Sequence, residues 1–222
     1  MVNYVMSSKI HITVGHYGSG KTEFSVNYAL FLKKTHDKVI LVDLDIVNPY
    51  FRSNDARKLL EEAGITVIAP DYAGTNVDIP VLPPEVMRIF NTPDAQIVID
   101  VGGDDDGAIA LGRYKQFFDR TDYEMNLVVN TRRPLSSTVE EIIEMKENIE
   151  ISSRLKITSI IADTNIADET TKEIIEEGFE ITKQAAKEMA LPIKYVVSMI
   201  DADFNDDVNN KLFKIERKLF KI

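Results

Sequence analysis

The sequence contains no cysteine. A chain without thiols forms no disulfide, and it provides no cysteine nucleophile and no thiolate ligand for zinc or an iron–sulfur cluster. It also contains no apolar run close to the roughly 18 residues that a membrane-spanning helix requires. Residues 1–9 lack the basic and apolar regions of an export signal. These absences exclude thiol chemistry and an integral membrane protein, and we expect the chain to be cytoplasmic.

Positive charge is also scarce, because 26 lysines and arginines stand against 36 aspartates and glutamates, for a net charge of −10. Non-specific binding to nucleic acid depends on lysine and arginine displacing counterions, so this balance argues against it. With 28% charged and 44% hydrophobic residues, a chain of 222 residues suits an α/β domain with helices on both faces of a sheet. We therefore predict one domain over residues 1–222.

Apolar strand-like runs alternate with amphipathic helix-like stretches along the chain, which is typical of a mostly parallel sheet with crossover helices. Strands are predicted at Lys9–Val14, Lys38–Val42, Ile65–Ala69, Gln96–Val101, Met125–Asn130, Ile157–Ala162 and Ile193–Met199. Helices are predicted at Lys21–Lys34, Asp55–Ala63, Pro84–Phe90, Ser136–Glu150, Glu169–Met189 and Asp206–Phe220, with a shorter one near Leu111–Phe118. Most of the strands are continuous apolar runs, as strands covered on both faces should be. The prediction is a three-layer α/β fold.

Residues 15–22 read Gly-His-Tyr-Gly-Ser-Gly-Lys-Thr and fit the pattern G-x-x-x-x-G-K-[ST] of a phosphate-binding loop. The segment lies between a predicted strand and a predicted helix, where such a loop has to lie. Its glycines allow the backbone to curl so that successive N–H groups point at phosphate oxygens, helped by the dipole of the following helix. The alternative is an ordinary glycine-rich turn. The spacing and the flanking elements favour the phosphate loop, and with it a P-loop NTPase fold.

The residues of this segment are candidate ligands of a nucleotide. Lys21 supplies a positive charge to the β- and γ-phosphates, and the hydroxyl of Thr22 is placed to bind Mg²⁺. The candidates are Gly15, His16, Tyr17, Gly18, Ser19, Gly20, Lys21, Thr22 and Glu23. The predicted cofactors are therefore a nucleoside triphosphate and Mg²⁺, with Lys21 in a catalytic role.

Two predicted strands end in aspartates that suit a magnesium site. The second strand runs into Asp43-Leu44-Asp45, and the fourth ends at Asp100, which Val101-Gly102-Gly103 follows. Bound Mg²⁺ keeps several waters, which nearby carboxylates hold. We interpret Asp100 as the Walker B acid and expect Gly103 to offer its N–H to the γ-phosphate, as a switch glycine does. Alternatively, each aspartate caps a following loop or helix; the presence of the phosphate loop favours the metal role.

The combination of a phosphate loop, Asp-Leu-Asp after the second strand and Asp-Val-Gly-Gly after the fourth resembles the MinD/ParA-type ATPases of the SIMIBI class, within the CobQ/CobB/MinD/ParA group of nucleotide-binding domains. The resemblance covers essentially the whole chain. It implies that Asp45 helps position the attacking water and the magnesium shell, with Asp43 as a supporting carboxylate. It also implies a mobile switch segment over residues 46–52, where Pro49 interrupts regular structure. Arg52 either meets phosphate or a partner, or is a surface arginine.

One position departs from the family. Its phosphate loop carries a signature lysine directly after the first glycine, and this chain has His16 there. In relatives that lysine crosses an ATP-sandwiched dimer to the other subunit's phosphates, so the dimer-activated mechanism does not simply carry over. A protonated His16 is a weaker substitute, because nearby phosphate favours the cation. The alternative is that His16 is a spectator.

The choice of base is predicted from a further absence, since the chain lacks the Asn-Lys-x-Asp pattern with which many GTPases read guanine. We therefore predict ATP. Asn165 and Asn130 follow two later strands, where the family's adenine-facing loops lie, and an asparagine amide can both donate to and accept from adenine's edge. Asn165 is the first candidate and Asn130 the second. Both are alternatively turn residues.

Near the end of the sequence, apolar residues recur at helical spacing with basic residues between them. The apolar positions are Val208, Leu212, Ile215, Leu219 and Ile222, and the basic ones are Lys211, Lys214, Arg217, Lys218 and Lys221. The pattern predicts a basic amphipathic helix. MinD-like proteins hold anionic membrane surfaces with such a helix, and Phe213 and Phe220 would add insertion. The alternative, which we favour, is a helix that packs on its own sheet.

Three functions fit these observations. The first is an ATPase that works as a conformational switch, with ATP and Mg²⁺ ordering residues 45–52 and 102–107 for a protein partner or a homodimer. The second is a transferase or ligase of the dethiobiotin synthetase-like type, which would activate a small molecule held by residues 70–83, including Tyr72, Asn76 and Asp78. The third is a nucleotide-binding regulatory module without significant turnover.

Overall fold

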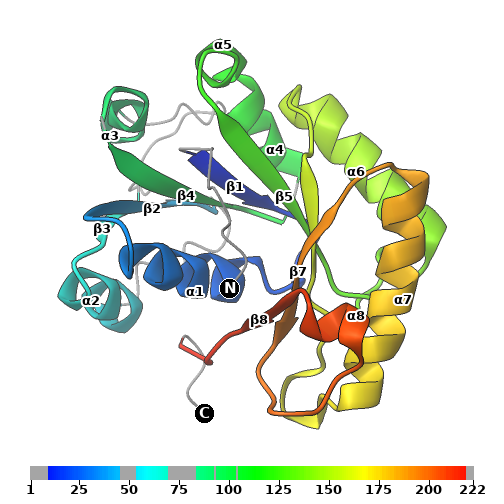
Figure 1. The fold of residues 1–222 in the computed structure, drawn as a ribbon. Coiled ribbons are helices and arrows are strands. Elements are labelled where there is room, and N and C mark those ends of the chain that lie inside the picture. Colours follow the sequence, from blue (N-terminus) through cyan, green and yellow to red (C-terminus); the bar gives the residue numbers. More distant parts are fainter. Residues whose placement is uncertain (1–9, 46–53, 70–83, 93, 104, 219–222) are drawn as a thin grey trace.

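The computed structural model describes residues 10–45, 54–69, 84–92, 94–103 and 105–218 (Figure 1). Its strands are β1 (Ile10–Val14), β2 (Lys38–Leu44), β3 (Thr66–Ile68), β4 (Ala95–Val101), β5 (Tyr123–Val129), β6 (Ser159–Ala162), β7 (Ile193–Ser198) and β8 (Leu212–Lys214). Its helices are α1 (Lys21–Lys33), α2 (Asn54–Glu62), α3 (Pro84–Met87), α4 (Asp105–Gly112), α5 (Lys115–Phe118), α6 (Val139–Ser153), α7 (Lys172–Glu188) and α8 (Asp206–Asn209). Two 3₁₀-helices lie at Arg88–Asn91 and Ala167–Glu169.

The eight described strands form one sheet in the order β3-β2-β4-β1-β5-β6-β7-β8, and every neighbouring pair is parallel. Parallel neighbours require crossover connections, which the helices provide. Strand β1 lies in the interior of the sheet, between β4 and β5. Because the carboxyl ends of parallel strands meet at one edge, the segments after β1, β2, β4, β5 and β6 all leave the sheet at that edge. The α/β prediction is confirmed.

Helices cover both faces of the sheet, which gives three layers (Figure 1). On one face α1 and α2 pack against alternate strand residues, including Leu41 and Val98. On the other face the helices from α3 to α8 pack against the intervening residues, including Ile40 and Ile97. Strands that are buried on both sides have no polar face to expose. This double burial explains why the strands appear in the sequence as continuous apolar runs.

The two long helices after β5 and β6 begin a few residues later than predicted, because threonines cap them. Thr138 accepts a hydrogen bond from the backbone N–H of Glu141 at 3.3 Å, and the Glu141 carboxylate accepts one from the N–H of Thr138 at 3.2 Å, which is a capping box. Thr171 caps α7 in the same manner through the N–H of Ile174. Helix α6 therefore starts at Val139, and α7 starts at Lys172.

The predicted helix over Asp206–Phe220 is wrong for the described residues. Helix α8 ends at Asn209, and the chain then forms β8 beside β7, with Phe213 paired to Val197. The strand places Phe213 and Ile215, two residues apart, in the core at 8% and 6% exposure. Apolar residues at the helical spacing also satisfy a short helix followed by a strand, and tertiary packing selects the second arrangement.

The phenylalanine of this strand belongs to an aromatic cluster on the α1 face. The ring centroid of Phe213 lies 5.7 Å from that of Phe24 and 4.9 Å from that of Tyr195. A side chain packed in this way is not available for insertion into a membrane. Residues 219–222, which include Phe220, lie outside the described residues. The described part of the segment thus packs on its own sheet, as we favoured, but as a strand.

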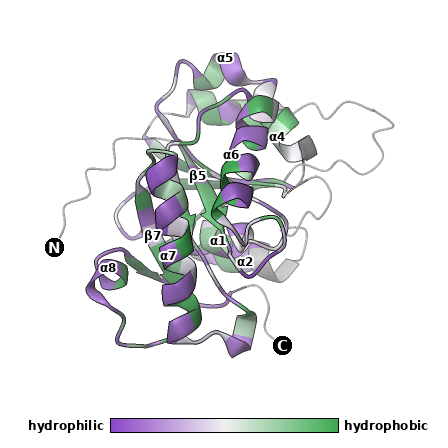
Figure 2. Cartoon of the chain, turned by 90° about the vertical axis from the view of Figure 1, so that its right-hand side faces the viewer, coloured by the Kyte–Doolittle hydropathy of each residue, from purple (hydrophilic) through white to green (hydrophobic). Residues whose placement is uncertain are grey.

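No helix within the described ranges is both long and apolar enough to cross a membrane. Figure 2 shows purple, hydrophilic residues on the side of α7 that faces the viewer and green, hydrophobic residues along β5 behind it. Among the smaller elements, the single helix predicted near Leu111–Phe118 is two helices, α4 and α5. The predicted switch segment over residues 46–52, with Pro49 and Arg52, lies outside the described residues. So does the predicted acceptor segment over residues 70–83, with Tyr72, Asn76 and Asp78.

Candidate functional site

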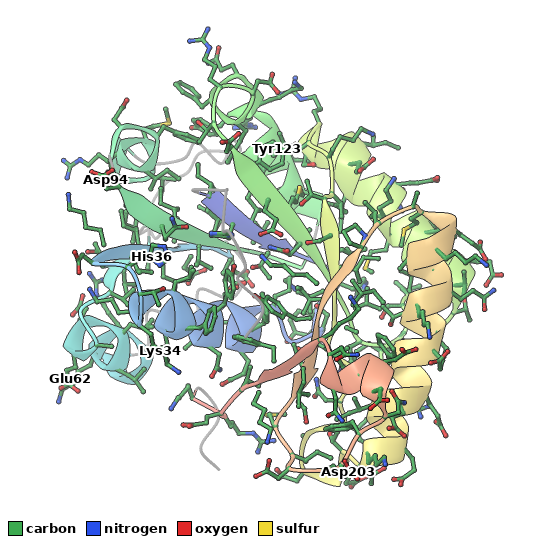
Figure 3. All side chains as sticks on the ribbon, in the orientation of Figure 1. Lys34, His36, Glu62, Asp94, Tyr123 and Asp203 are labelled. Carbon is green, nitrogen blue, oxygen red and sulfur yellow. The ribbon has the colours of Figure 1, made fainter. Side chains whose placement is uncertain are left out.

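The phosphate loop joins the interior strand β1 to the first turn of α1. Lys34 and His36, which follow α1, lie on the same side of the molecule as Asp94, which precedes β4 (Figure 3). These residues mark the edge where strands begin, so the loop lies at the opposite edge, where strands end. Gly20 immediately precedes α1 with φ of 95°, a conformation that side chains disfavour. A Cβ atom on Gly20 would lie only 2.0 Å from Oδ2 of Asp163, so this position also requires glycine for space.

Lys21 lies over this loop and is only 6% exposed. Its Nζ donates a hydrogen bond to the backbone oxygen of His16 at 2.9 Å. Gly103, which follows β4, approaches the same place, because a Cβ atom built on it would lie 2.9 Å from Lys21 Nζ and 2.6 Å from the backbone nitrogen of Tyr17. The structure therefore brings together the loop, its lysine and the glycine predicted to face the γ-phosphate.

Asp100, near the end of β4, faces the first turns of α1 and is 1% exposed. Its Oδ1 accepts a hydrogen bond from Ser25 Oγ at 3.2 Å, and the hydroxyl of Thr22 bonds to the same carboxylate. Burial raises the pKa of Asp100 to about 6, although the charge of Lys21 and the two hydroxyl hydrogen bonds lower it. A buried carboxylate with a raised pKa is stabilised by an additional cation nearby. The predicted metal residues Thr22 and Asp100 thus lie together.

The aspartates after β2 lie beside this pair. Asp43 pairs with Asp100 across the parallel strands β2 and β4, and both carboxylates are buried. Asp43 Oδ1 accepts the backbone N–H of Asp45 at 2.9 Å, and Asp45 is partly exposed. The charge of Asp45 also acts on Asp100, whose pKa it helps to raise. Asp43 therefore holds the turn that presents Asp45 near Asp100. The role of Asp43 as a supporting carboxylate of a magnesium site stays a prediction.

These residues fit a magnesium ion of the P-loop kind. The donors are a hydroxyl and carboxylates, and Mg²⁺ prefers such oxygen ligands. Within the described residues no three histidine, cysteine or acidic side chains form a metal-binding group on their own. Thr22 would bind the ion directly, Asp100 and Asp45 would hold its waters, and phosphate oxygens would complete the shell.

The loops after β5 and β6 are tied to each other by their asparagines. Asn130 donates from Nδ2 to the backbone oxygen of Asn165 at 3.0 Å, and its Oδ1 accepts from the N–H of Arg132 at 3.0 Å. Asn165 donates from Nδ2 to the backbone oxygen and to Oδ1 of Asp163, at 3.1 and 3.0 Å. Both amides make these hydrogen bonds within the protein, and the predicted role of the two asparagines at the adenine base stays a prediction.

Asp163 is the acid that connects these loops to the phosphate loop. It is 3% exposed and lies against Gly20. Burial raises its pKa to about 7, the charge of Glu23 adds to the rise, and the hydrogen bond from Asn165 opposes it. Carboxylates near a helix N-terminus are stabilised by the helix dipole. Asp163 lies directly against Gly20, so it restricts the positions that the backbone of the phosphate loop can adopt.

The remaining candidates of the loop have distinct surroundings. The Nδ1 atom of His16 lies 3.4 Å from the backbone oxygen of Tyr17, and the side chain of Tyr17 is exposed. Glu23 points to the C-terminal segment, because its Oε1 accepts the backbone N–H of Lys218 at 2.5 Å. In the loop itself Gly18 receives a hydrogen bond on its backbone oxygen from Nε of Arg133 at 3.1 Å.

Sequence and structure comparisons give different results. Neither a protein-family model nor a curated protein matches the sequence. Solved structures do match. The cell division protein FtsY of Thermotoga maritima aligns with 85% of this chain at a TM-score of 0.55 and 19% identity. The signal recognition particle 54 kDa protein of Aeropyrum pernix K1, solved in complex with GDP, aligns with 88% at 0.55 and 22% identity. Chloroplast FtsY of Physcomitrella patens aligns with 88% at 0.56 and 14% identity.

The fold is that of the P-loop nucleotide-binding proteins. This chain covers 61%, 42% and 59% of the three matched chains, respectively. At these identities the likeness shows the fold alone, and the SIMIBI class stays a prediction. Membership of the MinD/ParA family, and with it the significance of the missing lysine, stays a prediction.

Sequence reasoning missed three supporting residues. These are Ser25, which bonds to Asp100, Arg133, which bonds to Gly18, and Asp163, which fills the space behind Gly20. Asp163 carries a signal that could have revealed it, because it follows an apolar strand as Asp100 ends one. Ser25 and Arg133 carry no such signal. Ser25 reaches Asp100 because of its position on the turns of α1, and Arg133 reaches Gly18 because of the course of the loop after β5.

Proposed function

We propose that this protein is a magnesium-dependent nucleoside triphosphate hydrolase, with ATP as its nucleotide, that acts as a conformational switch for a protein partner or within a homodimer. The observation that carries the proposal is the convergence of Lys21, Thr22, Asp100 and Gly103 at the carboxyl ends of β1 and β4. Lys21 provides a cation, Thr22 a hydroxyl suited to a metal ion, and Asp100 a buried carboxylate. Gly103 brings its backbone close to the loop. Together they suit the phosphates of a bound nucleotide.

In the proposed reaction, water attacks the γ-phosphorus and the bond to the β,γ-bridging oxygen breaks, which yields the diphosphate and inorganic phosphate. The loop amides and Lys21 stabilise the charge that develops on the phosphate oxygens. Asp45, partly exposed beside the buried Asp100, orients the water. Bound Mg²⁺ would neutralise phosphate charge. We expect Asp45 after β2 and Gly103 after β4 to face the γ-phosphate, so that its loss would release both residues.

Lys21→Ala tests the proposal. We expect hydrolysis to fall by at least roughly a hundredfold, since one charged donor aimed at the transition state accounts for a loss of that order. Phosphate release and binding of a fluorescent ATP analogue are both measured. Lys34→Ala is the matched control, because Lys34 is an exposed lysine that follows α1. Normal hydrolysis by Lys21→Ala contradicts the proposal. Binding without hydrolysis in the wild type would instead identify a regulatory module.

The preference for ATP requires its own test. It is supported by the missing Asn-Lys-x-Asp pattern, whereas the similar Aeropyrum pernix protein was solved with GDP. We expect unlabelled ATP to displace a fluorescent ATP analogue at least roughly tenfold better than GTP, a difference of about 1.4 kcal/mol. Equal or better displacement by GTP contradicts the choice of ATP and leaves the nucleotide site itself intact.

A second function, ATP-dependent transfer to or ligation of a small molecule, is favoured by one observation. A cavity of about 290 Å³ opens beside Gly15, His16 and Gly103. Such a cavity gives an acceptor molecule room next to the γ-phosphate. Phosphate or diphosphate release that requires an added metabolite supports this function over the switch.

A further inference from the structure

The cavity beside the phosphate loop is enclosed by parts of the chain that are far apart in sequence. One wall is the end of β1 with Gly15 and His16, and another is the end of β4 with Gly102 and Gly103. Helices α4 and α6 close it on the face of the sheet opposite α1. Its volume of about 290 Å³ accommodates on the order of ten water molecules or a small organic molecule of similar bulk.

Most of the described lining is apolar. The apolar side chains are Val14, Val101, Ala108, Leu135, Met145 and Ile149. They come from β1 and β4, from α4 and α6, and from the loop before α6, so they are not confined to one wall. An apolar interior of this kind favours a ligand with a hydrocarbon body over a bare ion or a phosphate.

Besides His16 on the phosphate loop, the polar side chains of the lining lie along one face of α6. Glu141, Glu144 and Asn148 are spaced by three and four residues, so they follow one another on that face. Glu141 already accepts hydrogen bonds from Ser137 and Thr138, which lower its pKa and keep it ionised. Within the described part of the chain, the side chains of Glu144 and Asn148 have no hydrogen-bond partner.

The charge of the cavity is therefore one-sided. Its described lining contains two carboxylates and no lysine or arginine. A ligand with a carboxylate or phosphate beside Glu144 would be repelled, whereas a protonated amine would form a charge-assisted hydrogen bond. An apolar interior with an acidic rim complements an organic amine.

We propose that this cavity binds a small organic amine, with its hydrocarbon body between α4 and α6, its ammonium group on Glu144 and Asn148, and its other end toward the phosphate loop. This inference rests on the proposed function only in assigning the neighbouring loop to a nucleotide. The amine and the γ-phosphate would then occupy adjoining spaces, separated by His16 and Gly103. The amine is thus the class of small molecule whose binding nucleotide hydrolysis can sense.

Benzylamine and benzyl alcohol test the proposal as a matched pair, because they share size and shape and differ in charge. We titrate each into the nucleotide-free protein and follow binding by ligand-observed NMR. Benzylamine is expected to bind roughly tenfold tighter than benzyl alcohol, the effect of one charge-assisted hydrogen bond. Glu144→Gln should abolish that preference. Glu147→Gln, an exposed glutamate on the same helix outside the lining, should retain it.

Ala108→Leu provides a second test, because it fills the cavity from the buried face of α4 and should abolish binding of both probes. The thermal unfolding of Ala108→Leu is compared with that of the wild type. If Ala108→Leu does not fold, the comparison of Glu144→Gln with Glu147→Gln decides whether the proposal holds. Equal binding of the two probes, or equal effects of Glu144→Gln and Glu147→Gln, would overturn the proposal. A fluorescent ATP analogue titrated separately into the same proteins reports on the nucleotide site, so failure of the amine site and failure of the proposed function give different results.

Discussion

The Oδ2 atom of Asp163 occupies the position behind Gly20 where any side chain would begin, since a Cβ atom on Gly20 would lie 2.0 Å away from it. Asp163 follows β6, whereas Gly20 immediately precedes α1, so the contact links the loop after β6 to the phosphate loop. A rigid acid beneath the last glycine of the loop fixes the path of the backbone that turns into α1. The shape of the phosphate loop thus depends on a residue outside its motif.

Gly20→Ala should therefore disrupt the loop. It adds a clash with Asp163 to a positive φ of 95°, and such backbone strain alone costs about 1–3 kcal/mol. We expect a lower free energy of unfolding and loss of binding of a fluorescent ATP analogue. Gly18→Ala is the control, because φ is 74° there but the nearest atom is Arg133 Nε at 3.4 Å. Equal effects of the two substitutions would show that the contact with Asp163 is unimportant.

Asp163 should also make stability depend on pH near neutrality. Burial raises its pKa from 3.8 to about 7 in the folded state. Because the folded-state pKa is the higher one, its contribution to stability is complete below pH 3.8 and is lost as the pH rises through about 7. Asp163→Asn removes this titration. We expect the free energy of unfolding of the wild type, relative to that of Asp163→Asn, to fall by a few kcal/mol over this range. A constant difference between the two proteins contradicts the assignment.

Asp100→Asn should weaken the use of magnesium. Asp100 bonds to the Thr22 hydroxyl, and loss of a group that orients a metal ligand reduces metal affinity roughly tenfold to a hundredfold. The measurement is the Mg²⁺ concentration that gives half-maximal nucleotide hydrolysis. Asp119→Asn serves as the control, because Asp119 forms an exposed ion pair with Lys115 at 2.6 Å. An unchanged Mg²⁺ requirement in Asp100→Asn would remove this residue from the metal site.

Phe213→Ala tests the strand that replaces the predicted helix. Phe213 is buried among Phe24, Tyr28 and Tyr195, and truncation of a buried phenylalanine costs about 3–5 kcal/mol. Chemical denaturation measures the loss. Phe31→Ala should cost much less, since Phe31 lies at the edge of this cluster at 40% exposure. A loss for Phe213→Ala no larger than that for Phe31→Ala would contradict the packing of β8.

The parts of the protein that the sequence predicts correctly are those with a local pattern. The continuous apolar runs identify seven of the eight described strands, because a strand that is buried on both faces has no polar side to interrupt it. The phosphate loop is recognised for a similar reason, since its spacing within eight residues fixes its shape. The position of Asp100 beside the loop is predictable because a charged residue ends an apolar run at the edge where strands end.

Features that depend on contacts between distant segments escaped prediction. β8 is stabilised by the packing of Phe213 and Ile215 against α1 and β7. No local sequence pattern indicates that this segment prefers a strand to a helix. Asn130 and Asn165 bond to each other's loops because β5 and β6 are neighbours in the sheet, an order that a single sequence does not reveal. The same adjacency brings Asp163 beneath Gly20.

Helix α1 is bound to residues that follow it by most of the length of the chain. Asn27 exchanges hydrogen bonds with the backbone of Glu216, 189 residues later, and Glu23 accepts one from Lys218, 195 residues later. During synthesis the ribosome adds these partners long after the phosphate loop has emerged. Contacts at such separation form late because a long segment must first be closed. The helix that begins the nucleotide site would therefore lack these restraints on a nascent chain and gain them only when β8 joins the sheet.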